Sequence, residues 1–482
     1  MLLYKSFMHS RGARMALAAS ICLPFPFAAA SAQAVDGSPP AIRPWSVRDT
    51  LLKVAELDSL VRNALAANPE LRADRARVDA MRHRLGAAAA WPDPMLMVGL
   101  ENQPLGREPT TLSAHGTPVA GGPDPMTMRM IGVSQTIPYP GKTRLQRAIA
   151  QRGVDEAAAT LEVTRQQIAH DVRAAYYQLA FIDRALAIVD ENQSVLATFI
   201  RTTEVRYSVG QSGQQDVLKA RLEAARLAEQ ASSLLEERQA ALARLNASLD
   251  RPSDAPIDRA EIPDRVRRAA IGDSAQEIRF TASTLGARAA GSPLPSLLEL
   301  QDEAIANNAE LREHEAMIAA QTARVDLTRK SYLPDVDVSV QYGQRAGNLP
   351  DMLTAIVSVP IPVQKRRKQN EVTAEAVSAL AALHTEHMAK VNTLRAEVAR
   401  LVSELERERT QLALYQKGIL PQGRAVLAAA TSSYQVGKAD FTSVLESRAT
   451  LFNYETEYVR TISDFATNLA ELERVVGKEV LR

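Results

Sequence analysis

The sequence contains few of the residues that stabilise ordinary compact domains. Its 482 residues include one cysteine, Cys22, so an internal disulfide is excluded. Aromatic residues make up 5% of the chain, which is little for a conventional packed core. The net charge is +1, which indicates neither a nucleic-acid-binding surface nor an acidic tail. Alanine-rich segments dominate instead and favour closely packed helices.

The common enzyme motifs are also missing. The sequence has no Walker loop, dinucleotide fingerprint, nucleophile elbow or pair of metal-ligating cysteines. We therefore expect a protein that is not an enzyme and has no cofactor. His384 and His387 would share one helix face beside Glu386. Two histidines without a third ligand favour a solvated helix face over a metal site.

Long apolar runs are absent beyond the N-terminal region. Residues 1–34 are typical of a signal peptide: basic residues precede the apolar stretch 15–30, and Ala32 and Ala34 form a small-residue cleavage site. We expect the mature chain to begin at Val35. No later segment reaches the ~18 uncharged apolar residues of a transmembrane helix. A membrane crossing by the mature chain would therefore have to use strands.

The chain is a duplicated unit, because several short motifs recur in the same order. Asn68-Pro69-Glu70-Leu71-Arg72 recurs as Asn308-Ala309-Glu310-Leu311-Arg312, Trp91-Pro92-Asp93 as Leu333-Pro334-Asp335, Pro138-Tyr139-Pro140 as Pro360-Ile361-Pro362, and Tyr207-Ser208-Val209-Gly210 as Tyr434-Gln435-Val436-Gly437. We expect a first repeat over 35–250, a proline-rich linker over 251–296 and a second repeat over 297–482. Each repeat is predicted as helix, strand, loop, strand, long helix, tight turn and long helix.

The long helices carry a coiled-coil period. Apolar residues recur every seven positions at Leu161, Ile168, Ala175, Ile182, Val189 and Leu196. This spacing predicts a seam along which the helix packs on another helix. A single helix over 142–206 would be about 95 Å long. A soluble coiled coil would show the same pattern.

The strands favour a membrane protein over a soluble coiled coil. Apolar Val336, Val338, Val340 and Tyr342 alternate with polar residues. Each repeat supplies one hairpin, and four strands cannot close a barrel around a lumen. Their open edges must then pair with copies of the same chain, with apolar side chains facing lipid.

In these features the chain resembles the TolC-type outer-membrane efflux channels. The resemblance rests on the duplication, Trp91-Pro92-Asp93-Pro94 before the first strand, the run QTIPYPGK over 135–142, and the two Tyr-x-Val-Gly turns. It implies a mainly α fold with a small β part. Three chains would form a 12-stranded transmembrane β-barrel continuous with a long periplasmic α-helical barrel. It also implies the outer membrane of a Gram-negative bacterium, a membrane-fusion adaptor and a proton-driven inner-membrane pump.

The resemblance assigns roles to both turns. Val209, Gly210, Val436 and Gly437 would be the periplasmic tips that contact the adaptor, although helix-hairpin turns alone would also use glycine. Tyr434 matches the family's gating tyrosine. Ala439 stands where the family often has a basic gating residue, with Lys438 nearby. Asp216 and Glu446 would form carboxylate rings in a trimer, or else are solvated helix starts.

The cargo prediction comes from methionine in the first hairpin. Met95, Met97, Met126, Met128 and Met130 lie there, and strand alternation places them opposite Leu96, Val98 and Ile131. We expect them to face the lumen. Thioether sulfur is a soft ligand for Cu(I), and the hairpin resembles those of heavy-metal efflux channels. Methionine is also an adaptable apolar filler.

The sequence thus predicts a passive exit duct for copper- or silver-like cations, or otherwise for drugs. Two alternatives stay open. The same fold can serve type I protein secretion, and the helices alone would suit a periplasmic coiled-coil adaptor.

Overall fold

The computed structural model describes residues 56–102, 111–112, 118–119, 127–210, 212–272, 294–345 and 349–481. The expected signal peptide, Met126 and linker residues 273–293 lie outside the described residues.

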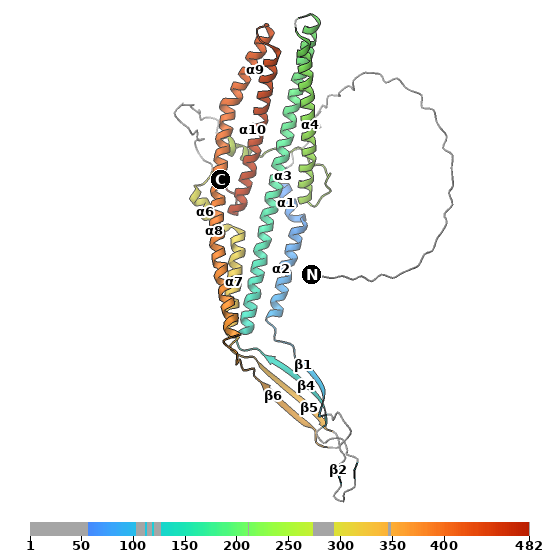
Figure 1. The fold of residues 1–482 in the computed structure, drawn as a ribbon, viewed down its shortest axis with the longest axis vertical. Helices are drawn as coiled ribbons and strands as arrows, with labels where there is room; N and C mark the ends of the chain where they lie inside the picture. Colours follow the sequence, from blue (N-terminus) through green and yellow to red (C-terminus); the bar gives the residue numbers. More distant parts are fainter. Residues whose placement is uncertain are drawn as a thin grey trace, which may run out of the picture. The chain divides into compact units, whose positions relative to one another are not determined.

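Both repeats have two short helices, two long strands and a helical hairpin in the same order, and the first has the short strands β2 and β3 in addition (Figure 1). The first contains α1 (Leu57–Ala67), α2 (Pro69–Ala88), β1 (Met95–Glu101), β2 (Thr111–Leu112), β3 (Pro118–Val119), β4 (Met128–Ile137), α3 (Lys142–Ser208) and α4 (Gln214–Ser248). A short helix, α5 (Asp264–Ile271), lies in the connecting segment. The second contains α6 (Leu297–Asn307), α7 (Ala309–Lys330), β5 (Val336–Arg345), β6 (Met352–Ser358), α8 (Gln369–Leu414), a π-turn η1 (Tyr415–Ile419), α9 (Leu420–Gln435) and α10 (Phe441–Val476).

Each repeat begins with two short helices where the sequence predicted one, and an asparagine separates them. Asn68 Oδ1 accepts a hydrogen bond from Glu70 N at 2.8 Å, and Asn308 Oδ1 accepts one from Leu311 N at 3.1 Å. Each side-chain amide also donates to the last helix of its own repeat, at 3.2 Å to Ser248 O and at 3.0 Å to Val475 O. The asparagine therefore caps one helix and ties the start of the repeat to its end.

Asn308→Ala is expected to destabilise the folded chain by about 1–3 kcal/mol, because it removes a cap and leaves buried polar groups unpaired. The thermal midpoint of the helical circular dichroism signal should fall by about 2 °C or more. Asn307→Ala is the matched control, since the Asn307 side-chain amide donates within its own helix, to Glu303 O at 3.0 Å. Equal shifts for the two variants would contradict the bridging role.

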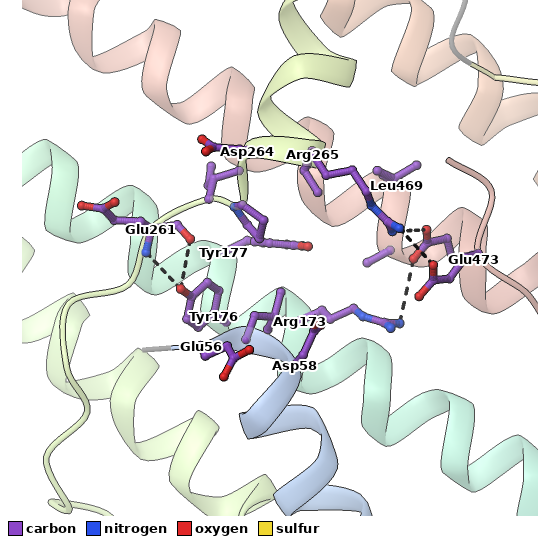
Figure 2. A pocket seen from close by; sticks show the side chains of 16 residues that line it. Glu56, Asp58, Arg173, Tyr176, Tyr177, Glu261, Asp264, Arg265, Leu469 and Glu473 are labelled. Atoms are coloured by element: carbon purple, nitrogen blue, oxygen red, sulfur yellow. Dashed lines mark hydrogen bonds and ion pairs between the residues drawn. The ribbon is translucent and has the colours of Figure 1, made fainter. Parts of the chain in front are cut away.

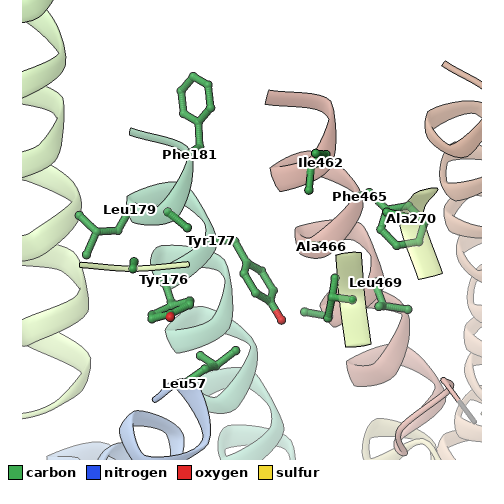
Figure 3. Close-up of a cluster of buried hydrophobic side chains, with 14 of the residues drawn as sticks. Leu57, Tyr176, Tyr177, Leu179, Phe181, Ala270, Ile462, Phe465, Ala466 and Leu469 are labelled. Carbon is green, nitrogen blue, oxygen red and sulfur yellow. The ribbon is translucent and has the colours of Figure 1, made fainter. Parts of the chain in front are cut away.

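The core joins α3 and α10 with α1, α4, α5, α6 and α8. Figure 3 shows the part where α1, α3, α5 and α10 meet. Tyr176 and Leu179 of α3 and Phe465 of α10 are each at most 1% exposed. The predicted seven-residue seam of α3 is confirmed: its members are buried in this core or packed against it, and α3 runs unbroken for 67 residues.

The second repeat departs from the first in its long helix. Where α3 is continuous, the counterpart is split into α8 and α9 by the π-turn at Tyr415–Ile419. Pro421 explains the break, since proline has no backbone N–H and its ring clashes with the preceding turn. The added residue in the π-turn accommodates the proline without ending the helix.

The four long strands form one antiparallel sheet in the order β1-β4-β5-β6. Each repeat contributes a hairpin, as predicted, and β4 pairs with β5 to join the repeats. An ion pair of 2.8 Å between Lys142 Nζ and Asp335 Oδ1 connects the start of α3 to the segment before β5. None of the described helices is both long enough and apolar enough to cross a membrane.

Candidate functional site

Two glycine turns end the helical hairpins. Gly210 follows α3 with φ of 74°, and Gly437 follows α9 with φ of 72°, so both adopt the left-handed conformation that glycine tolerates best. At the second turn, Gly437 N donates to Tyr434 O at 3.1 Å and Lys438 N donates to Ser433 O at 2.9 Å. This pair of bonds is a Schellman motif. The sequence prediction that glycine ends both helices is confirmed.

The turns present apolar side chains to the outside. Val209 is 62% exposed and Val436 is 68% exposed. A Cβ added at Gly210 or Gly437 would meet no described atom within 4 Å. Both turns are therefore exposed, and their backbone conformation depends on glycine.

Arg206 joins the two turns, and the sequence analysis did not identify it. It lies in the last turn of α3, and its guanidinium donates to Tyr434 O at 3.2 Å and Gln435 O at 3.1 Å. Its Cζ also lies 4.7 Å from the Tyr434 ring centroid. A cation at these carbonyls stabilises the C-terminal end of α9. The sequence signal for Arg206 was a basic residue in the last turn of a helix. Nothing in the sequence indicated that its partner would be Tyr434 in the other repeat.

Tyr434 is held inside its own chain. The side chain is 7% exposed, and its ring lies 5.4 Å from that of Phe441, between centroids. Its hydroxyl is buried and has no hydrogen-bond partner among the described residues. Asp216 lies in the first turn of α4, and Glu446 is exposed on α10. The structure thus places Arg206, not Lys438 or Ala439, against the tyrosine.

The sheet has two chemically different faces, and its register sorts the methionines onto one of them. Across the β1–β4 pair, Met95 lies opposite Ser134, Met97 opposite Gly132, and Met130 opposite Gly99. The same face continues across β5 and β6 with Asp337, Ser339, Gln341, Gly343, Met352, Thr354, Ile356 and Ser358, of which Met352 and Ile356 are apolar. The four described methionines of the first hairpin therefore share a largely polar face.

The opposite face is apolar and open to the outside. It carries Leu96, Val98, Leu100, Ile131, Val133, Val340, Tyr342, Leu353 and Val357, all exposed. Arg129, Gln135 and Gln344 interrupt it, and Gln135 donates to Pro92 O at 2.6 Å. So large an exposed apolar area needs a covering of lipid or protein.

Glycines on the methionine face make room for long neighbours. A Cβ at Gly343 would lie 2.8 Å from Met128 Sδ, and a Cβ at Gly132 would lie 2.6 Å from Gln341 Cγ. Met128 is consequently 8% exposed, whereas Met95 is 60% exposed. The methionine sulfurs therefore do not all have the same access to solvent.

A charged pocket of about 460 Å³ lies beside the core (Figure 2). Glu473 pairs there with Arg265 at 3.7 Å and with Arg173 at 4.0 Å, and burial raises the pKa of the Glu473 carboxyl. The Tyr176 hydroxyl donates to Glu261 O at 3.0 Å and accepts from Glu261 N at 3.1 Å. These ion pairs and hydrogen bonds hold the connecting segment and α5 against α3 and α10.

Comparison with known families gives one match over most of the chain. The sequence profile of the family described as outer membrane efflux protein matches residues 60–251 and 300–478. A curated relative, the cobalt-zinc-cadmium resistance protein CzcC of Cupriavidus metallidurans, is 22% identical over 346 residues, which cover 70% of this chain and 74% of the relative.

Solved structures show the same fold. The outer membrane protein VceC of Vibrio cholerae superposes with a TM-score of 0.68 at 17% identity, covering 88% of this chain and 96% of VceC. The channel CusC superposes with a TM-score of 0.69 at 16% identity, covering 89% of this chain and 93% of CusC.

Proposed function

Because the chain belongs to the outer membrane efflux protein family, we propose that it is a passive exit duct, with the energy for export supplied by a partner pump. Members of this family are TolC-type channels of the Gram-negative outer membrane that extend into the periplasm and work with an adaptor and an inner-membrane pump. The periplasmic coiled-coil adaptor considered from the sequence is thereby set aside.

The proposed assembly is a homotrimer. Three copies of the four-stranded sheet would give a barrel of twelve strands. Pairing β1 of one chain with β6 of the next would satisfy both open edges. The exposed apolar face would then contact lipid and the methionine face would line the lumen. The observation that supports the proposal is that the sheet has one exposed apolar face and one largely polar face.

The two turns are the proposed adaptor contacts. Val209 and Val436 supply exposed apolar side chains at the ends of the hairpins, and Gly210 and Gly437 set the backbone shape beneath them. Tyr434, Asp216 and Glu446 form the proposed periplasmic gate. Arg206 is expected to keep the gate closed within each chain, because its bonds to Tyr434 and Gln435 hold the two hairpins together.

The proposed cargo is a soft metal cation of the copper or silver type, conducted without chemical change. Met95, Met97, Met128 and Met130 share the proposed lumenal face, and thioether sulfur binds such cations through weak, exchangeable bonds. Met352 of β6 lies on the same face. The name of the relative CzcC records metal resistance for that protein, which supports a metal over an organic drug. The division into repeats 35–250 and 297–482 around a linker at 251–296 is part of the same proposal.

Changing the five hairpin methionines to leucine is expected to lower copper or silver tolerance while tolerance to a bulky organic toxin is kept. Cells lacking their own exit duct would carry the chain, its pump and its adaptor, and growth against each toxin would be measured. Met388→Leu, on an exposed helix position, is the matched control. Outer-membrane trimer content is measured in the same cells.

Two results would count against the proposal. Unchanged metal tolerance in an assembled trimer would mean that the methionines only pack the sheet. A wild-type monomer in the periplasmic fraction would overturn the exit duct itself.

A further inference from the structure

A run of four basic residues, Lys365-Arg366-Arg367-Lys368, lies between β6 and α8 of the second repeat. Figure 1 shows this connection, which leads from the end of the sheet to the start of the long helix. All four side chains are exposed. None of the four forms an ion pair within the part of the chain that the structure describes. Their positive charge is therefore not neutralised by side chains of the same chain.

The place of the run at the start of a helix also favours an anion. Lys368 is the N-cap residue of α8, and its side chain makes no capping hydrogen bond. The first N–H groups of a helix carry a partial positive charge, so cations there destabilise the helix and anions stabilise it. Glu371 supplies one carboxylate in the first turn, which is less charge than the run requires. Phosphate suits both features, because it accepts hydrogen bonds from backbone N–H groups and from arginine.

The first repeat makes the same connection without the run. Pro138-Tyr139-Pro140 corresponds to Pro360-Ile361-Pro362, but Gly141 alone precedes α3, whereas residues 363–368 precede α8. Lys142 of the first repeat has a side chain that is 13% exposed and pairs with Asp335 at 2.8 Å. Joining the strand to the helix therefore requires neither the added residues nor their charge.

Exposed apolar side chains lead from the sheet to the run. Val359 is 48% exposed, Ile361 is 80% exposed and Val363 is 86% exposed. At every second residue they continue the exposed apolar series that includes Leu353 and Val357 of β6. An apolar surface that ends in exposed lysine and arginine is typical of a segment at the boundary between the acyl chains of a membrane and its headgroups.

We propose that the basic run binds the phosphate groups of anionic phospholipids in the membrane leaflet that faces the periplasm. This inference rests on the proposed function, because placing the apolar face of the sheet in the outer membrane puts the end of β6 at that boundary. Basic residues near a membrane surface attract anionic lipids, and an arginine guanidinium can donate two hydrogen bonds to one phosphate. The contact would fix the depth of the sheet, with Ile361 and Val363 among the acyl chains.

A neighbouring copy of the chain matches the run less well. In the proposed barrel β6 pairs with β1 of the next chain, and the exposed Asp93 precedes β1. One carboxylate does not balance four cations. An anionic leaflet supplies one negative charge for each headgroup, so it can match the whole run.

Native mass spectrometry of the purified full chain in detergent, with equal amounts of dioleoylphosphatidylglycerol and dioleoylphosphatidylcholine, tests the proposal. Wild type is expected to retain the anionic lipid at least about tenfold over the zwitterionic one. Arg366→Gln combined with Arg367→Gln should lower that ratio by at least about fivefold. The corresponding double lysine variant keeps the charge and should keep most of the preference. Lys390→Gln combined with Arg395→Gln, at exposed positions farther along α8, is the matched control and should behave like wild type.

Two further arms separate the lipid from other anionic partners. An excess of inorganic phosphate should leave the lipid bound, because phosphate makes no contact with Ile361 and Val363. Asp93→Asn should leave both the trimer and the lipid ratio unchanged. Displacement of the lipid by phosphate would identify a free-phosphate site and overturn the proposal. Loss of the trimer both in Asp93→Asn and in the double glutamine variant would identify a contact between chains and overturn it as well.

The wild-type ratio and the double glutamine variant decide the result. Equal retention of the two lipids by wild type, or an unchanged ratio in an assembled double glutamine variant, would overturn the inference. Lipids are counted on purified protein without pump, adaptor or cargo, so this failure leaves the exit duct untouched. A wild-type monomer in the periplasmic fraction would instead overturn the exit duct and, with it, the lipid contact.

Discussion

Replacing Gly437 or Gly210 with valine is expected to abolish efflux while the trimer remains in the outer membrane. Both glycines have φ above 70°, where a β-branched side chain is strained by at least ~1–2 kcal/mol. Each turn would change shape at its exposed valine, and a cost of ~1.4 kcal/mol corresponds to tenfold weaker binding. Three copies of each turn dock together in the proposed trimer, so the losses multiply. The measurement is the resistance to the exported toxin of cells that express each variant together with the pump and adaptor.

The turn at Gly210 also contains a control residue, Gly213. Gly213 has φ of −80° and ψ of 151°, an extended conformation that valine adopts readily, and a Cβ there would make only ordinary contacts. Gly213→Val should therefore keep full resistance. Gly437→Asn should recover part of it, because asparagine tolerates the left-handed region. Disappearance of the trimer in Gly437→Val would instead identify the glycines as folding determinants and remove the adaptor assignment.

Glu408→Gln is expected to stabilise the chain at pH 8 and to leave its stability at pH 5 unchanged. Glu408 of α8 is 2% exposed, and burial raises the pKa of its carboxyl to about 7. Oε1 accepts from Asn468 Nδ2 at 2.8 Å and from Arg407 Nη2 at 3.2 Å, whereas Oε2 is buried and has no hydrogen-bond partner among the described residues.

The sign follows from the two protonation states. Protonated Glu408 is favoured in the folded chain, so its stabilising contribution is complete below the usual glutamate pKa and is lost as pH rises through about 7. The loss from pH 5 to pH 8 approaches about 3 kcal/mol at ~1.4 kcal/mol per pKa unit. Glu408 lines a pocket of about 820 Å³, separate from the one in Figure 2. The other charged groups that line it are Asp171 of α3, Arg244 of α4, Glu404 and Arg407 of α8, and Asp464 of α10.

Thermal midpoints of wild type, Glu408→Gln and Glu404→Gln would be compared between pH 5 and pH 8. Glu404 is partly exposed and paired with Arg400 at 2.7 Å, so its variant should keep the wild-type pH dependence. Burial also raises the pKa of Asp464, so a smaller slope should persist in Glu408→Gln. A wild-type stability that does not fall between pH 5 and pH 8 would contradict the assignment.

The sequence by itself determined the order of elements, the duplication and the two faces of the sheet. These follow from local patterns: a seven-residue apolar period along α3, a two-residue alternation in β5, and glycine after Tyr-x-Val. Such patterns depend on residues a few positions apart in the sequence, so they can be recognised without knowing the tertiary structure. The methionine face was predicted on this basis alone, because alternation decides which side chains lie together along a strand.

Tertiary structure alone decided which distant residues meet. Alternation marks the faces of a strand but not its neighbour, so the pairing of β4 with β5 across the two repeats was not predictable. The same holds for Arg206 beneath Tyr434 and for His314 of α7, whose ring stacks on that of His387 and leaves His387 half-buried instead of solvated. These contacts depend on how helices from different repeats are rotated and aligned against one another. Many side chains along the whole core set that alignment together, and no short motif records it.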